Sequence, residues 1–140
     1  MTLAAGLTIV CCFGSFLRSE TAASVWNGIF TAGQAKRGEA LHRKACASCH
    51  GDALEGKGTA PPLSGGDFKM NWNGQTVGDL FDKIQDSMPA DQPGSLKPQE
   101  NADILAFLLK VNTFPEGQSE LPGDSQTLQK IQFQAAKPSQ

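Results

Sequence analysis

Five consecutive residues, Cys46-Ala47-Ser48-Cys49-His50, place two thiols and an imidazole at C-x-x-C-H spacing. This spacing is that of a c-type haem attachment site, in which each thiol forms a thioether with one vinyl group of the porphyrin. On a helical turn, the histidine that follows would lie under the iron as its proximal ligand. We therefore expect Cys46 and Cys49 to bind one covalent haem c and His50 to bind its iron.

Two other kinds of site use the same residue types. A structural zinc site needs four ligands, and outside the motif the only other cysteine or histidine residues are His42, Cys11 and Cys12. A thioredoxin-like redox pair needs a preceding strand within a βαβ unit, whereas the residues before Cys46 have a helical pattern. The motif therefore favours haem over zinc or disulfide exchange.

A second axial ligand is expected elsewhere in the chain, because haem iron in an electron carrier is usually six-coordinate. Met1 belongs to the start of the chain, which leaves Met70 and Met88. Met88 precedes a proline between two expected helices, far enough after His50 for the chain to pass round the haem. We therefore expect Met88 to be the distal ligand; the alternative is an ordinary core methionine.

The stretch 51–66 is rich in glycine and proline and is expected to be a loop that shields one haem edge. A carbonyl at Pro61 or Pro62 is placed to accept the Nδ1 proton of His50, which would fix the orientation of the imidazole. Trp72 follows in a short alternation of apolar and polar residues. If buried, its indole N–H needs an acceptor such as a haem propionate.

The first expected helix leads into the motif. Thr31 stands three residues before Gln34, which is a capping-box spacing and predicts a helix that runs to about Ala47. Gly38 lies inside this helix, where a glycine costs about 1 kcal/mol relative to alanine. We interpret Gly38 as a point where a second helix approaches closely.

Further helices are expected after the loop. Apolar residues at helical spacing predict a helix over 76–87, and Pro98 opens another whose apolar centre, 102–111, predicts burial. A short helix within 124–133 is a further candidate. The predicted fold is all-α, with three to four helices and long loops wrapped round one haem.

The length of 140 residues fits one domain, and the net charge of -2 has no run of like charges. Neither nucleic acid nor an anionic membrane surface is therefore indicated as a partner. Residues 1–23 contain an apolar run followed by small residues, which is typical of a cleaved export signal. No Lys or Arg precedes that run, so an uncleaved N-terminal membrane anchor is the alternative. The expected division is an export signal over 1–23, a haem domain over 24–114 and a polar C-terminal extension over 115–140.

The order helix, C-x-x-C-H, Pro-rich loop, helix, Met-Pro and final helix resembles the class I cytochrome c family. In that family a glycine eight residues before the first haem cysteine packs against an aromatic residue of the last helix; Gly38 and Phe107 match these positions. The resemblance also implies that Pro61 presents the carbonyl that holds the proximal histidine and that Met88 is the distal ligand. One departure is His42, which stands where the family typically has an aromatic residue.

The stretch 74–117 is similar to bacterial single-haem cytochromes and to the cytochrome domains of quinoprotein (pyrroloquinoline quinone) alcohol dehydrogenases. We therefore expect a periplasmic electron carrier between a dehydrogenase and a downstream acceptor, either a monomer or a subunit of a larger complex. It is not expected to be an enzyme, because six-coordination leaves no open position and no further cluster of catalytic side chains is evident. The alternatives are a haem subunit fixed within an oxidoreductase complex, or a five-coordinate haem enzyme or gas sensor.

Overall fold

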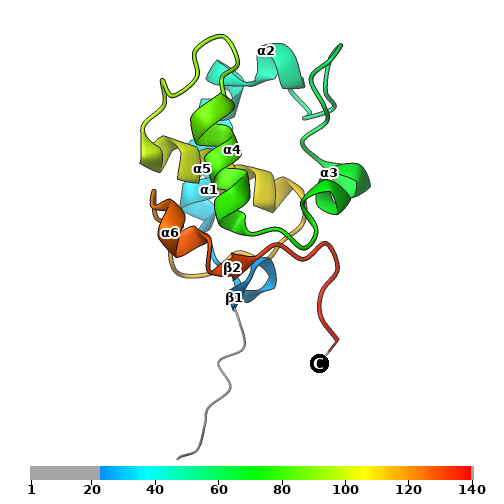
Figure 1. The fold of residues 1–140 in the computed structure, drawn as a ribbon, viewed down its shortest axis with the longest axis vertical. Helices are drawn as coiled ribbons and strands as arrows, with labels where there is room; N and C mark the ends of the chain where they lie inside the picture. The colour runs from blue at the N-terminus through cyan, green and yellow to red at the C-terminus, as the bar shows by residue number, and fades with distance from the viewer. Residues whose placement is uncertain (1–22, 140) are drawn as a thin grey trace, which may run out of the picture.

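The computed structural model describes residues 23–139 and is mostly helical. The three longest α-helices meet in the middle of the molecule, and two very short strands lie at one end (Figure 1). In chain order the elements are β1 (Ala23–Ser24), the 3-10 helix η1 (Val25–Asn27), α1 (Ala32–Ala45), α2 (Ala47–His50), α3 (Gly65–Trp72), α4 (Val77–Ser87), α5 (Pro98–Val111), α6 (Ser125–Leu128) and β2 (Ile131–Gln132).

The two longest helices, α1 and α5, cross in close contact at Gly38. A Cβ atom added to Gly38 would lie 2.9 Å from the Cβ of Phe107 and nearer still to the backbone carbonyl of Asp103. Beside this crossing, the guanidinium of Arg37 donates two hydrogen bonds to the carboxylate of Asp103, at 2.8 and 3.0 Å. The expected close approach of a second helix at Gly38 is confirmed, and the second helix is α5.

Local sequence features account for where the main helices begin. The Oγ1 of Thr31 accepts the backbone N–H of Gln34 at 3.1 Å, and a complete capping box between Thr76 and Asp79 starts α4. Helix α5 has Pro98 at its first position, where the missing N–H of proline costs nothing. Helices α1, α4 and α5 therefore confirm the three main predictions to within two residues at each end.

Helix α3 was not predicted. The alternation of apolar and polar residues around Trp72 is typical of a strand, but Phe68 and Trp72 are also four residues apart, which places them on one face of a helix. Their rings lie 6.5 Å apart, and the ring of Phe68 also packs edge-on against Phe133 at 6.3 Å. The helix is selected by this contact with the C-terminal segment, which the alternation alone does not reveal.

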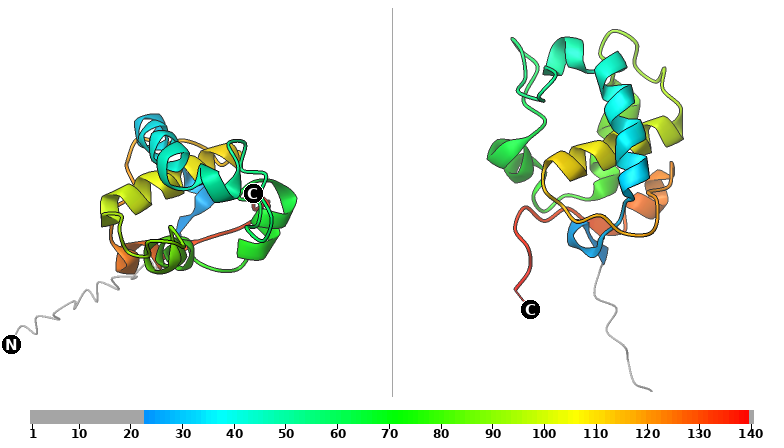
Figure 2. Two further views of the ribbon diagram at one scale, coloured as in Figure 1. Left: turned by 90° about the horizontal axis from the view of Figure 1, so that it is seen from above. Right: turned by 180° about the vertical axis from the view of Figure 1, so that it is seen from behind.

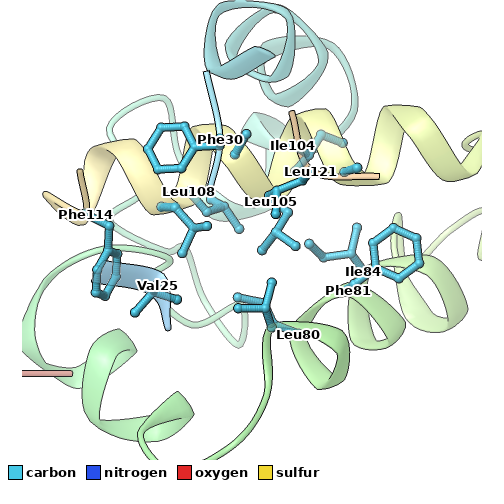
Figure 3. Packing of buried hydrophobic residues seen from close by; sticks show 14 of the residues in the cluster. Val25, Phe30, Leu80, Phe81, Ile84, Ile104, Leu105, Leu108, Phe114 and Leu121 are labelled. Carbon is cyan, nitrogen blue, oxygen red and sulfur yellow. The ribbon is translucent and has the colours of Figure 1, made fainter. Parts of the chain in front are cut away.

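The apolar core lies where α4 faces α5, and Figure 3 shows Leu80 and Ile84 of α4 opposite Leu105 of α5. Residues 115–139, expected as a polar extension, contribute three buried apolar side chains to this core: Leu121, Leu128 and Phe133. In the same segment, α6 is shorter than the helix predicted within 124–133, because the chain turns at residues 129–130 to form β2.

Strand β2 pairs in parallel with β1, so the C-terminal segment is tied to the first described residues. The indole of Trp26 strengthens this tie by donating to the carbonyl of Gln134 at 2.9 Å. Both strands lie at the end of the molecule away from α2, as the views in Figures 1 and 2 agree. Between residues 23 and 139, no helix has both the length and the apolar character needed to cross a membrane.

Candidate haem site

The C-x-x-C-H motif lies at a break between two helices. Helix α1 ends at Ala45, Cys46 leaves the helical conformation (φ -123°, ψ -34°), and α2 then makes a single turn that ends at His50. Gly51 follows with φ +84°, a conformation that favours glycine, and a side chain there would collide with the carboxylate of Glu55. This local geometry leaves Cys49 exposed and Cys46 half-buried, while His50 is buried.

Both motif sulfurs are free thiols in the structure. Burial, together with a smaller effect of the neighbouring Cys49 thiol, raises the pKa of Cys46 to about 11. Cys46 is therefore a neutral thiol at pH 7. Two unpaired thiols separated by two residues are what covalent attachment of a haem through its two vinyl groups requires.

The imidazole of His50 is held by the loop that follows it. Its Nδ1 lies 2.9 Å from the carbonyl oxygen of Pro61, and because a carbonyl only accepts, Nδ1 carries the proton and donates. In the neutral ring, Nε2 is then the nitrogen without a proton and the one able to bind a metal. The carbonyl of Pro61 is therefore in the position that the sequence predicted for an acceptor of the Nδ1 proton of His50.

The loop reaches His50 because it folds back on α2. The N–H of Gly56 donates to the carbonyl of His50 at 2.7 Å, and Leu63 N–H donates to the carbonyl of Leu54 at 2.9 Å. Gly56 has φ +79°, and a Cβ there would lie 2.7 Å from the carbonyl oxygen of Ala60. The backbone near Gly56 is thus tightly packed against the stretch that presents the Pro61 carbonyl.

The two methionines considered as distal ligands lie on different elements. Met88 caps the C-terminus of α4, is half-buried, and donates its N–H to the carbonyl of Ile84 at 3.0 Å. Met70 lies on α3 and is 64% exposed. The C-terminal end of α4 and the loop after it lie at the same end of the molecule as α2 (Figures 1 and 2). Trp72, half-buried, lies at the end of α3.

The donor set fits a covalently attached haem. It consists of two free thiols, an imidazole whose Nδ1 is already engaged, and a methionine on a separate element at the same end of the fold. The structure brings His50 and Pro61 into direct contact and leaves Met88 and Trp72 on two other elements. His42, considered in the sequence as a zinc ligand and as a departure from a family pattern, is a buried residue of α1 whose ring contacts Phe107.

The comparisons with known proteins agree with this geometry. Residues 33–108, more than half of the chain and including the motif, match the model of the family described as cytochrome C oxidase, cbb3-type, subunit III. A chain in the crystal structure of the sulfane dehydrogenase SoxCD from Paracoccus pantotrophus has a similar fold, with a TM-score of 0.54 and 25% identity. That match covers 94% of the present chain and 68% of the other. No curated protein matches the sequence.

The family match and the fold support the same conclusion. The crossing of α1 and α5, the motif at the end of α1 and the loop that holds His50 form a cytochrome c fold, as the sequence predicted. Such a domain transfers electrons through a bound haem. The chain therefore belongs to the cbb3-type cytochrome c oxidase subunit III family and is a class I c-type cytochrome.

Proposed function

We propose that the protein is a single-haem electron carrier that works between a dehydrogenase and a downstream acceptor in the periplasm. One haem c is attached through Cys46 and Cys49, and its iron is ligated by His50 and Met88. The observation that carries the proposal is the hydrogen bond from Nδ1 of His50 to the carbonyl of Pro61, at 2.9 Å. In a neutral imidazole this bond leaves Nε2 without a proton, as binding to a metal requires.

The residues of the chain have separate tasks in this proposal. The two thioethers hold the porphyrin, and the Pro61 carbonyl keeps the His50 ring in one orientation and makes it a stronger donor. A thioether sulfur from Met88, together with the imidazole of His50, would hold the haem iron and raise its reduction potential. The indole of Trp72, half-buried on α3, is the candidate donor to a propionate. When bound, the haem supplies one-electron redox chemistry.

We infer that partners dock by a small, transient interface over the end of the molecule that carries α2, as weak redox encounters do. The net charge of -2 predicts that the encounter depends only modestly on salt. A quinoprotein dehydrogenase is the partner class suggested by the resemblance of residues 74–117. The proposal includes electron transfer alone, without turnover of a small substrate.

A second candidate function is a haem subunit fixed within an oxidoreductase complex. It is favoured by the similarity to a chain in the structure of a dehydrogenase, SoxCD. The two roles differ in the stability of the association. Co-purification of the native protein with a dehydrogenase in constant ratio, through washes at high salt, supports the fixed subunit; recovery as a free monomer supports the carrier.

Mass spectrometry and spectroscopy test the proposed haem centre. The protein is expressed in a host competent for cytochrome maturation and exported, and its mass is measured. The expected result is a chain that starts near Ala23 or Ser24 and carries the mass of one haem that acid acetone does not extract. This result reports the covalent attachment of the haem, the number of haems and the export of the chain together. A colourless protein, or a pigment that acid acetone extracts, would overturn the proposal.

The distal ligand is tested by a matched pair of methionine variants. A band in the far red from charge transfer between methionine sulfur and ferric iron is expected in the unaltered protein. Met88→Ala should lose the band and lower the reduction potential, while Met70→Ala should keep both. High-spin ferric haem in the unaltered protein would instead indicate a five-coordinate enzyme or sensor, and loss of the band in Met70→Ala would move the ligand to α3.

A further inference from the structure

His42 is a buried histidine whose polar atoms have no partner in the described part of the chain. It is 1% exposed, and neither Nδ1 nor Nε2 has a hydrogen-bond partner. Buried polar side chains are nearly always hydrogen-bonded, because an unmet donor or acceptor loses its interactions with water. His42 is therefore an exception to this rule, and apolar packing alone does not explain why a polar ring is buried here.

The ring itself is well packed. It lies 5.4 Å from the ring of Phe107 at an angle of 44°, at the crossing of α1 with α5. It also lies one helical turn before Cys46, whose N–H donates to the His42 carbonyl at 2.8 Å. A phenyl ring would make the same contacts without burying two nitrogens. The distinctive property of an imidazole at this place is that it can gain a proton near neutral pH.

The surroundings of His42 oppose its protonation overall, although two carboxylates favour it. Burial is the main cause that lowers the pKa of His42, and the neighbouring His50 and Arg43 lower it further. Asp52 and Glu55, in the loop after α2, act in the opposite direction. On α5, the helix that the His42 ring packs against, Asp103 is paired with Arg37 and Lys110 with Glu116.

We propose that His42 takes up a proton when the haem is reduced and releases it when the haem is oxidised. The proposal rests on the proposed function, which places a haem on Cys46, Cys49 and His50. Ferric iron carries one more positive charge than ferrous iron, and like charges repel more strongly in a poorly solvated interior than in water. His42 beside the attachment site should therefore hold its proton more tightly in the ferrous protein.

The step balances one electron against one proton. On reduction, an electron from the redox partner reaches the iron, and a proton from solvent binds the unprotonated ring nitrogen of neutral His42. Oxidation returns the electron to the acceptor and the proton to solvent. The reduction potential must then fall as pH rises through the interval between the two proton affinities. A tenfold difference between these affinities corresponds to a total change of ~59 mV for one electron.

The first test is a spectroelectrochemical titration of the haem-loaded protein from about pH 4.5 to 8, compared with His42→Phe. The unaltered protein should show a drop in potential over this range that His42→Phe lacks, because the propionates are common to both. Arg43→Gln is the companion variant: it removes a neighbouring cation and should move the drop to higher pH. Identical pH profiles for the unaltered protein and His42→Phe would overturn the inference.

The second test needs no variant. The chain has only two histidines and His50 is the proposed ligand, so the ring protons of His42 can be followed by NMR without ambiguity. Their titration midpoint should lie at higher pH in the ferrous than in the ferric protein. Equal midpoints, or no titration above about pH 4.5, would refute the proton coupling. If the protein instead carries no covalent haem, both the proposed function and this inference fail. If it carries a haem that is reversibly reduced but whose reduction potential does not change with pH, only the role of His42 is refuted.

Discussion

Replacing Gly38 by alanine tests the helix crossing on which the haem site is built. The new Cβ would lie 2.9 Å from the Cβ of Phe107, well inside the ~3.5–4.0 Å optimum for two carbon atoms. The carbonyl of Asp103 would be nearer still, and neither atom lies at the end of a flexible side chain that can rotate away. Helix α5 must therefore move away from α1 by about 1 Å, which also strains the ion pair between Arg37 and Asp103.

The size of the effect follows from two opposing terms. Overpacking of a well-packed contact costs about 1–3 kcal/mol. Alanine is intrinsically better than glycine in a helix by ~1 kcal/mol, which offsets part of this cost. Gly33 supplies the matched control in the same helix, because a Cβ there meets only the Oγ1 of Thr31, at 3.8 Å. Gly33→Ala should therefore leave the free energy of unfolding unchanged or raise it by up to ~1 kcal/mol.

The assay is urea unfolding of the haem-loaded protein, followed by far-UV circular dichroism, with the free energy of unfolding extrapolated to water. Gly38→Ala should be less stable than Gly33→Ala by ~1–3 kcal/mol with the same dependence on urea concentration. Equal stability of the two variants, within about 0.5 kcal/mol, would refute the steric argument and with it the assigned contact between α1 and α5.

Two further predictions concern the loop and the C-terminal segment. Gly56→Ala should displace the Pro61 carbonyl and shift the reduction potential, as measured by spectroelectrochemistry. Gly58→Ala is the control and should not shift it, because both glycines have positive φ but a Cβ at Gly58 meets no atom within 4 Å. Equal reduction potentials of the two variants would contradict this account. The hydrogen bond from Arg37 lowers the pKa of Glu120. The ionised Glu120 therefore stabilises the folded protein above the usual pKa of a glutamate, and this contribution is lost as pH falls through the lowered pKa of Glu120. Arg37→Gln should therefore flatten the fall in melting temperature between pH 7 and about 3, and an unchanged slope would show that this ion pair does not contribute to acid stability.

The predictions from sequence succeeded where a structural feature depends on neighbouring residues. Thr31, Thr76 and Pro98 each define a helix start through contacts within one turn, so the starts of α1, α4 and α5 could be predicted. Gly38 was interpretable because a glycine inside a strong helix needs a reason, and the partner residue Phe107 followed from the family resemblance.

The predictions failed, or could not be made, where the decisive contact comes from a distant part of the chain. Helix α3 depends on Phe68 meeting Phe133, and a short alternating pattern cannot reveal that contact. The side chain of Gln34 does not complete the predicted capping box; it exchanges two hydrogen bonds with the backbone of Leu121, at 2.8 and 2.9 Å. A glutamine is normally a surface residue, so nothing in the sequence indicated that this one holds the C-terminal segment against α1.

The sequence alone predicted the chemistry of the site, because two thiols and an imidazole at C-x-x-C-H spacing, without a fourth zinc ligand or a preceding strand, favour haem attachment. The tertiary structure decided the environment of those residues. It placed the Pro61 carbonyl 2.9 Å from Nδ1 of His50, buried both nitrogens of His42 without partners, and packed Leu121, Leu128 and Phe133 into the core. The physical reason is that burial, desolvation and hydrogen-bond partners depend on segments that meet only when the whole chain has folded.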